Sequence, residues 1–247
     1  MLAVRELSLA RRLDSVTTAF HAGEMTAICG PNGAGKSSLL TALAGLIAAD
    51  TGEVNLEGTT LSAMPPQLRA QAIGYLPQAP EVAWDISVVT LVSLGRLPWR
   101  AGAKADRAAV EAALTTMGLQ GLRRRPVTRL SGGERARALM ARVLAGQPRW
   151  ILADEPLANL DLAHQQGLLK VLRDQAAAGV GVVLVLHGLA EAINHADRAL
   201  VLHRGELVAD GAPEAVLDAA TIRRIWGVEA RWLGEPGARA LAIHPSL

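Results

Sequence analysis

The chain has 247 residues, enough for one large α/β domain or two small ones. Half of the residues are hydrophobic and 19% are charged, which is typical of a packed globular protein. The 25 lysines and arginines exceed the 23 aspartates and glutamates by only two, so the dense basic patch of a nucleic-acid partner is not expected. Aromatic residues make up 3%, too few for the successive stacking platforms of single-strand binders.

Short apolar runs and a single cysteine exclude further classes. The longest apolar run, residues 180–186, is far below the roughly twenty residues of a membrane span. Arg5 and Glu6 interrupt the first apolar residues, so no signal peptide is expected. Cys29 alone cannot form an internal disulfide or a cysteine-rich metal site. We therefore expect a cytosolic protein.

Hydrophobic periodicity predicts strands and helices that alternate along the chain. The predicted strands are residues 1–9, 24–30, 53–56, 73–76, 150–153, 180–186 and 199–202. The predicted helices are residues 35–46, 88–94, 106–117, 133–145 and 162–177. This alternation indicates parallel βαβ units, with the helix-rich middle as an inserted lobe. Residues 230–243 are expected to form a hairpin around 234–237.

A phosphate-binding loop pattern stands between a predicted strand and a predicted helix. Its glycines allow successive backbone N–H groups to surround an anion, and the helix N-terminus adds partial positive charge. Lys36 is expected to reach the β- and γ-phosphates of ATP, and the Ser37 hydroxyl to bind Mg²⁺. The predicted ATP-binding residues of this loop are Gly30, Pro31, Asn32, Gly33, Ala34, Gly35, Lys36, Ser37 and Ser38.

Two carboxylates follow the apolar strand at residues 150–153. Asp154 suits a second contact to Mg²⁺, directly or through water. Glu155 lies one residue further, where it could act as general base on an attacking water. An acidic turn alone is a weak signal, but it gains weight from the phosphate-binding loop upstream.

The sequence Leu-Ser-Gly-Gly-Glu at residues 130–134 predicts a second anion site. A serine hydroxyl and glycine N–H groups at the start of a helix can bind phosphate, so Ser131, Gly132 and Gly133 are expected to bind ATP. The same residues also fit a serine N-cap with Glu134 in the first turn. Two anion sites but one phosphate-binding loop indicate that two identical chains close head to tail on two ATP molecules.

Together these motifs resemble those of the nucleotide-binding subunit of ATP-binding cassette (ABC) transporters, over essentially the whole chain. The resemblance implies an α/β fold: a P-loop NTPase core of the RecA-like type, an N-terminal antiparallel β subdomain and an inserted helical subdomain. It implies one domain of residues 1–247. The helical subdomain is expected at residues 80–147 and a C-terminal hairpin tail at residues 228–247.

The resemblance assigns three further residues. Gln78 matches the glutamine that links Mg²⁺ and the attacking water to the membrane partner. Asp161 matches the aspartate that faces the opposite subunit, and His187 matches the histidine that contacts the γ-phosphate. The implied catalytic residues are therefore Glu155, His187 and Gln78. The implied Mg²⁺ ligands are Ser37, Gln78 and Asp154.

The chain departs from the family's pattern at the adenine site. Most relatives stack an aromatic ring on adenine from the loop after the first strand, and this loop has none. Arg11 or Arg12 is expected over the base instead, a cation–π contact of about 0.5–2 kcal/mol. Discrimination among ATP, GTP and CTP should then be weak. Gly188 replaces an aspartate and Ala158 a serine of the family, and both are expected to loosen neighbouring site residues.

The sequence Leu-Gly-Arg-Leu-Pro at residues 94–98 resembles importers of iron chelates, haem and vitamin B12. That resemblance implies a homodimer of ATPases at the cytoplasmic face of a membrane, bound to two separate permease subunits and acting indirectly with a substrate-binding protein. Trp84 and Trp99 are candidate permease contacts, and a core role for either fits equally well. The alternative is a soluble ABC ATPase in iron–sulfur cofactor assembly.

Overall fold

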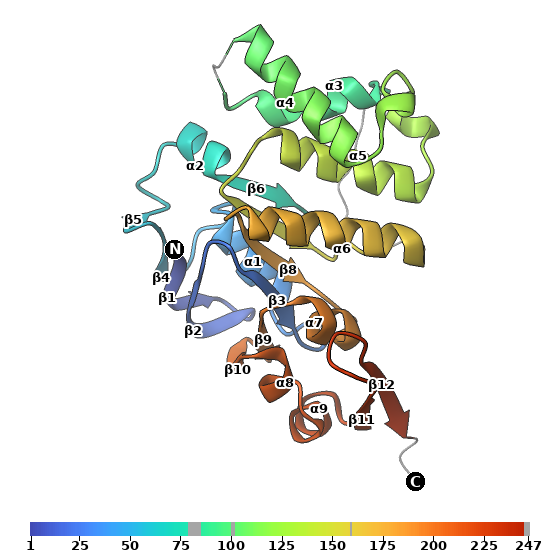
Figure 1. The fold of residues 1–247 in the computed structure, drawn as a ribbon. Helices are drawn as coiled ribbons and strands as arrows, with labels where there is room; N and C mark the ends of the chain where they lie inside the picture. Colours follow the sequence, from blue (N-terminus) through green and yellow to red (C-terminus); the bar gives the residue numbers. More distant parts are fainter. Residues whose placement is uncertain (79–84, 100–101, 159, 245–247) are drawn as a thin grey trace.

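The computed structural model describes residues 1–78, 85–99, 102–158 and 160–244, so the candidate contact Trp84 lies outside the described residues. Figure 1 shows a helical region at one end, a central sheet, and small helices with a hairpin at the other end. Within the described ranges, no helix has the length and apolarity that a bilayer crossing requires.

A six-stranded sheet forms the centre, in the order β10-β9-β3-β8-β7-β6. Its strands are β3 (Met25–Cys29), β6 (Ile73–Leu76), β7 (Trp150–Asp154), β8 (Gly181–Val185), β9 (Arg198–His203) and β10 (Glu206–Gly211). All pair in parallel except β10, which runs antiparallel to β9. Every residue of β3, β7 and β8 is buried, as expected of parallel strands covered on both faces. The predicted parallel arrangement is confirmed.

A smaller antiparallel sheet covers one face of the centre, in the order β2-β1-β4-β5. Its strands are β1 (Leu2–Leu9), β2 (Leu13–Phe20), β4 (Thr51–Leu56) and β5 (Thr59–Thr60). Helix α1 (Lys36–Leu43) lies against both sheets, and its leucines share a core with Phe20 and Trp150. The implied N-terminal β subdomain is confirmed. Periodicity missed β2, because register irregularities between β1 and β2 break its alternation.

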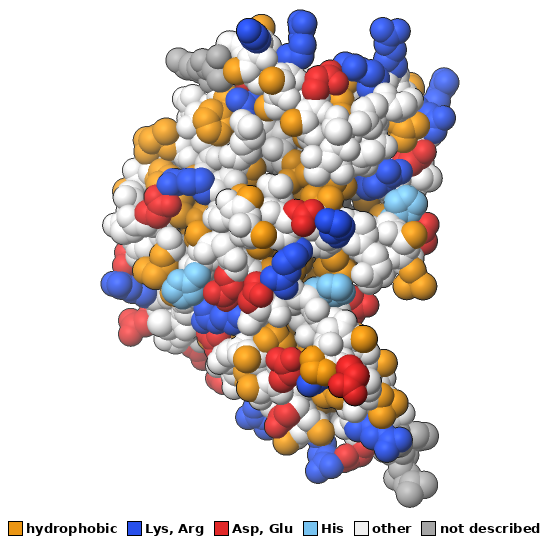
Figure 2. Space-filling view, viewed as in Figure 1, with side chains coloured by type: hydrophobic (Ala, Val, Ile, Leu, Met, Phe, Trp, Pro, Cys, Tyr) orange, Lys and Arg blue, Asp and Glu red, His pale blue; other side chains and the backbone are white. Residues whose placement is uncertain are grey.

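The helical lobe consists of α3 (Val88–Ser93), the 3₁₀ turn η1 (Leu94–Arg96), α4 (Ala103–Thr116) and α5 (Gly132–Ala145). Helices α3 and α4 pack against α5 and against each other. Two further 3₁₀ turns, η2 (Gln120–Leu122) and η3 (Val127–Arg129), precede α5. Figure 2 shows that lysines and arginines gather over this lobe, at the top of the view.

The remaining helices are α2 (Pro66–Ala72), α6 (Leu162–Ala177), α7 (Leu189–His195), α8 (Pro213–Val216) and α9 (Ala219–Trp226). The chain ends in the expected hairpin, β11 (Glu229–Leu233) and β12 (Ala240–His244). Helices α3 to α9 contribute to the core on the face of the central sheet opposite α1. Periodicity missed α2, α7, α8 and α9, each of which has eight residues or fewer; the equally short α1 and α3 were predicted from their denser apolar residues.

Candidate functional site

The phosphate-binding loop follows β3 and opens α1. Gly30 has φ +150°, and a Cβ there would lie 2.2 Å from the Leu202 carbonyl oxygen of β9. Gly35 caps α1 with φ +99°, and a Cβ there would lie 2.5 Å from the Arg12 carbonyl oxygen. Neither backbone neighbour can move without disturbing a strand or turn, so only glycine fits at both positions.

Lys36 is the first residue of α1, and its side chain is 6% exposed. Its Nζ donates hydrogen bonds to the carbonyl oxygens of Gly30, at 2.8 Å, and Pro31, at 2.9 Å. Burial lowers the pKa of Lys36, and the nearby carboxylate of Glu155 opposes that shift. The loop therefore holds a cation beside its own backbone N–H groups, an arrangement that suits phosphate.

Asp154 ends β7 and is 3% exposed. Burial raises the pKa of its carboxyl, while a hydrogen bond with Ser37 lowers it. Its Oδ1 has no hydrogen-bond partner among the described residues. Buried oxygen atoms without partners are costly unless a ligand satisfies them, and Mg²⁺ prefers oxygen ligands. Asp154 and Ser37 therefore fit the predicted Mg²⁺ site.

Glu155 and His187 lie in direct contact beyond the ends of adjacent strands β7 and β8. Oε1 of Glu155 lies 2.5 Å from Nε2 of His187, with side chains 15% and 47% exposed. Glu155 adopts φ +50°, a left-handed conformation that is uncommon outside glycine and concentrates at functional sites. The fold thus joins two of the three predicted catalytic residues, whose roles stay predictions.

A cavity of about 590 Å³ opens over the phosphate-binding loop. It is lined by Arg11, Arg12, Asn32, Gly33, Ala34, Gly35, Lys36, Ser37, Ser38, Gln78, Glu155 and His187. The exposed Gln78, which follows edge strand β6, joins the other two predicted catalytic residues here. No aromatic side chain appears in this lining within the described residues, and both expected arginines do.

Ser131, Gly132 and Gly133 do not line this cavity. Ser131 instead caps α5: its Oγ accepts a hydrogen bond from the Glu134 backbone N–H at 3.2 Å. Glu134 Oε2 in turn accepts one from the Ser131 backbone N–H at 2.8 Å, which completes a capping box. The prediction that Ser131 is an N-cap is confirmed. If residues 131–133 also bind a phosphate, as predicted, that phosphate is not one bound in this chain's own cavity.

Asp161 begins α6 close to the same residues. Its Oδ1 accepts a hydrogen bond from the His164 backbone N–H at 2.9 Å and lies 2.8 Å from Nδ1 of that histidine. The backbone hydrogen bond is the main cause of the lowered pKa of Asp161. A Cβ on Gly133 would lie 3.8 Å from His164 Nδ1. His164 received no role from the sequence, although Asp-x-x-His at a helix start was a usable signal.

The space beside Gly188 is filled by Glu191 of α7. A Cβ on Gly188 would lie 1.7 Å from Glu191 Oε2, so this carboxylate occupies the place of the missing side chain. Both residues line a smaller cavity of about 210 Å³ together with Glu155 and His187. Glu191 therefore occupies the place that an aspartate side chain at residue 188 would take, and the loosening of His187 expected from the sequence stays a prediction.

A buried parallel sheet that carries a phosphate-binding loop after one strand and an acidic pair after another defines a P-loop nucleotide hydrolase. The family described as "ABC transporter" matches residues 13–158, and the chain belongs to this family. It is an ABC-type ATPase, as the sequence implied, and its predicted fold class is confirmed.

Curated relatives and solved structures agree with this assignment. The chain is 40% identical to a hemin import ATP-binding protein of Streptomyces coelicolor, over 94% of this chain and 84% of the relative. It is 41% identical to the protein of the same name in Myxococcus xanthus, over 92% and 90%. A metal-chelate type ABC transporter, solved in an inward-facing conformation, superposes with a TM-score of 0.83 at 25% identity, over 100% and 97%.

The contact between Gly188 and Glu191 predicts a stability effect. We expect Gly188→Asp to lower the free energy of unfolding by about 1–3 kcal/mol, because the new side chain must displace a carboxylate of like charge. The double variant Gly188→Asp/Glu191→Ala should recover most of the loss in urea titrations. The matched control is Gly121→Asp, where nothing lies within 4 Å. Equal stability of Gly188→Asp and this control would contradict the expectation.

Proposed function

We propose that two copies of this chain bind two molecules of ATP head to tail, each between the phosphate-binding loop of one copy and residues 131–133 of the other. The observation that carries this proposal is the divided site. The cavity over the loop is lined by residues 32–38 and by the three predicted catalytic residues, but by none of residues 131–133. Gly133 and Asp161, on neighbouring helix starts, form the surface that would face the second copy.

Hydrolysis follows from the side chains around the cavity. Glu155 takes a proton from a water that Gln78 and His187 help to hold, and the water oxygen attacks the γ-phosphorus in line. The bond from the γ-phosphorus to the β,γ-bridging oxygen breaks on the opposite side, so that ADP leaves and phosphate is formed. His187 Nε2 contacts Glu155 Oε1 and orients that carboxylate. Lys36 neutralises charge on the phosphates. When bound, Mg²⁺ held by Ser37, Asp154 and Gln78 would neutralise the charge of the β- and γ-phosphates.

The adenine platform is formed by Arg11 or Arg12. Both lie in the turn between β1 and β2, where Arg11 adopts φ +61° and the Arg12 backbone packs against the loop at Gly35. A guanidinium over the base accepts the π-face of any nucleobase, so ATP, GTP and CTP should be discriminated weakly. Affinity would then depend mainly on the triphosphate.

Closure of the two copies drives two integral-membrane permease subunits that import an iron chelate, haem or vitamin B12. The hemin import relatives, at 38–41% identity, favour haem within this range. A relative of known structure, 26% identical, is part of an ABC transporter complex, which supports permease partners and peripheral attachment to the cytoplasmic face of a membrane. Nothing in these relatives favours the alternative of a soluble iron–sulfur assembly factor.

Glu155→Gln should still bind ATP but hydrolyse it about tenfold more slowly or worse, because an amide cannot accept the proton. Phosphate release measures the loss of turnover. Gel filtration with ATP measures the closed dimer, which this variant should stabilise. Lys36→Ala serves as the contrast, since it should lose both binding and turnover. Near-normal turnover in Glu155→Gln would refute Glu155 as the base.

Arg11→Ala/Arg12→Ala should raise the KM for ATP about two- to thirtyfold, the equivalent of the expected cation–π energy. The native chain should hydrolyse ATP, GTP and CTP with kcat/KM values within about tenfold of one another. Arg5→Ala on β1, an exposed arginine outside the cavity, is the control. A strict ATP preference that persists in the double variant would contradict the arginine platform.

Co-purification tests the transport proposal. The tagged chain, expressed in its own organism and extracted in mild detergent, should bring down a membrane protein with several apolar segments. The genes next to that partner's gene would narrow the range of candidate substrates. Lys36→Ala is the matched control, because association that does not need ATP should survive in it. Recovery from the soluble fraction alone, with assembly proteins, would favour the alternative.

A further inference from the structure

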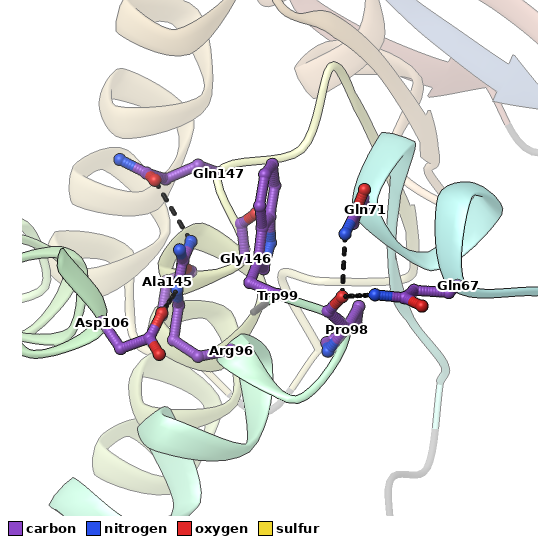
Figure 3. A network of polar contacts seen from close by, with 9 residues as sticks. All are labelled: Gln67, Gln71, Arg96, Pro98, Trp99, Asp106, Ala145, Gly146 and Gln147. Carbon is purple, nitrogen blue, oxygen red and sulfur yellow. Dashed lines mark hydrogen bonds and ion pairs between the residues drawn. The ribbon is translucent and has the colours of Figure 1, made fainter. Parts of the chain in front are cut away.

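A buried arginine at the edge of the helical lobe has no part in the proposed ATP site. Arg96, at the end of η1, is 6% exposed. Its Nε donates to Asp106 Oδ1 of α4 at 2.9 Å, and its Nη1 donates to the carbonyl oxygen of Ala145 at 3.0 Å and to Gln147 Oε1 at 3.1 Å (Figure 3). A charge is buried at this depth only when its partners are fixed, so Arg96 ties α4 to the end of α5.

The same segment closes the carboxyl end of α5. The Ala145 carbonyl is among the last carbonyls of α5, which lack partners within a helix, and a cation there is favoured by the helix dipole. Trp99 Nε1 donates to the Gly146 carbonyl oxygen at 2.9 Å, and the Trp99 ring centroid lies 4.8 Å from the Arg96 guanidinium carbon. A Cβ on Gly95 would lie 2.0 Å from the Arg142 carbonyl oxygen, so η1 approaches α5 backbone to backbone.

The segment also reaches across to the nucleotide-binding core. The Pro98 carbonyl oxygen accepts hydrogen bonds from Nε2 of both Gln67 and Gln71 at 2.8 Å, and both glutamines belong to α2 (Figure 3). The last residue of α2, Ala72, accepts a hydrogen bond from the Arg149 backbone N–H at 2.9 Å. Residues 94–99 therefore join α2 to the end of α5; we call this connection the 94–99 clamp.

We propose that Arg96 is a positioning residue for ATP hydrolysis, acting through the 94–99 clamp; this inference rests on the proposed function. Helix α5 begins at residues 131–133, β6 leads to Gln78, and β7 leads to Glu155. The clamp holds the opposite end of α5 and the chain just before β6 and β7. Over the 14 residues of α5, about 21 Å, a small tilt at the clamp displaces Ser131. A misplacement of about 1 Å can cost about a hundredfold in rate.

The test separates the clamp from general stability. Gln67→Ala/Gln71→Ala removes the contact to the core from one exposed and one half-buried side chain. Arg96→Lys keeps the charge but loses the fork geometry. We expect kcat to fall about tenfold in the double variant, with a smaller rise in the KM for ATP, because Ser131 is displaced while the phosphate-binding loop, which holds most of the triphosphate, is untouched. The kcat of Arg96→Lys should also fall. Gln120→Ala, an exposed glutamine of η2, is the control.

A distance measurement gives an independent readout. Spin labels at Leu46→Cys, after α1, and Ala112→Cys, on α4, report the position of the lobe relative to the core. The native Cys29 stays unlabelled, since it is fully buried and burial raises its pKa to about 12. The distance distribution should broaden in Gln67→Ala/Gln71→Ala and stay narrow in the control.

Three results decide the matter. A broadened distance distribution, with kcat lowered by a larger factor than KM is raised, supports the positioning role. A narrow distance with native kcat overturns the clamp, and a broadened distance with native kcat overturns its role in hydrolysis. If the native chain itself turned over no ATP, the proposed function would be wrong, and the distance distribution alone would still decide whether the clamp exists.

Discussion

The parallel hydrogen-bonded ladder of the central sheet is the constraint on which the rest of the site depends. Its register pairs Val185 of β8 with Asp154 of β7 on one side and with Ile28 of β3 on the other. Glu155 therefore follows the paired residue Asp154 by one position, and His187 follows the paired residue Val185 by two. Both lie beside the start of the phosphate-binding loop, which follows β3. A slip of one residue in β8 would turn His187 to the opposite face of the sheet and separate it from Glu155.

The parts of this arrangement that could be predicted from the sequence are those marked by a local motif or by a pattern that recurs along the chain. Buried parallel strands are continuous apolar runs, and the loop at residues 30–38 joins a strand to a helix in a fixed pattern, so both were predicted near their true bounds. Gln78 and His187 came from resemblance alone, because a single glutamine or histidine after a strand carries no pattern of its own. The fold supplied the reason for their proximity, since both follow strands on either side of β7.

Contacts between segments far apart in the sequence could not be predicted from residue patterns. Glu191 occupies the space over Gly188 only because α7 begins with a turn that brings its third residue back, and no propensity predicts that carboxylate's position. Arg96 looked like part of a family signature, yet its partners come from two helices and the loop after α5, up to 51 residues away. Such long-range satisfaction of a buried charge depends on the packed fold.

Lys36 shows how the fold orders the phosphate-binding loop. Its ammonium is held by the Gly30 and Pro31 carbonyls, so the rotamer freedom of a long side chain, up to about 2 kcal/mol, has been given up during folding. An anion that binds this ammonium would exchange the two carbonyls for its own oxygens, with less side-chain entropy left to lose. The ammonium is thus ordered during folding, and any anion that takes the place of the two carbonyls has to compete with both of them.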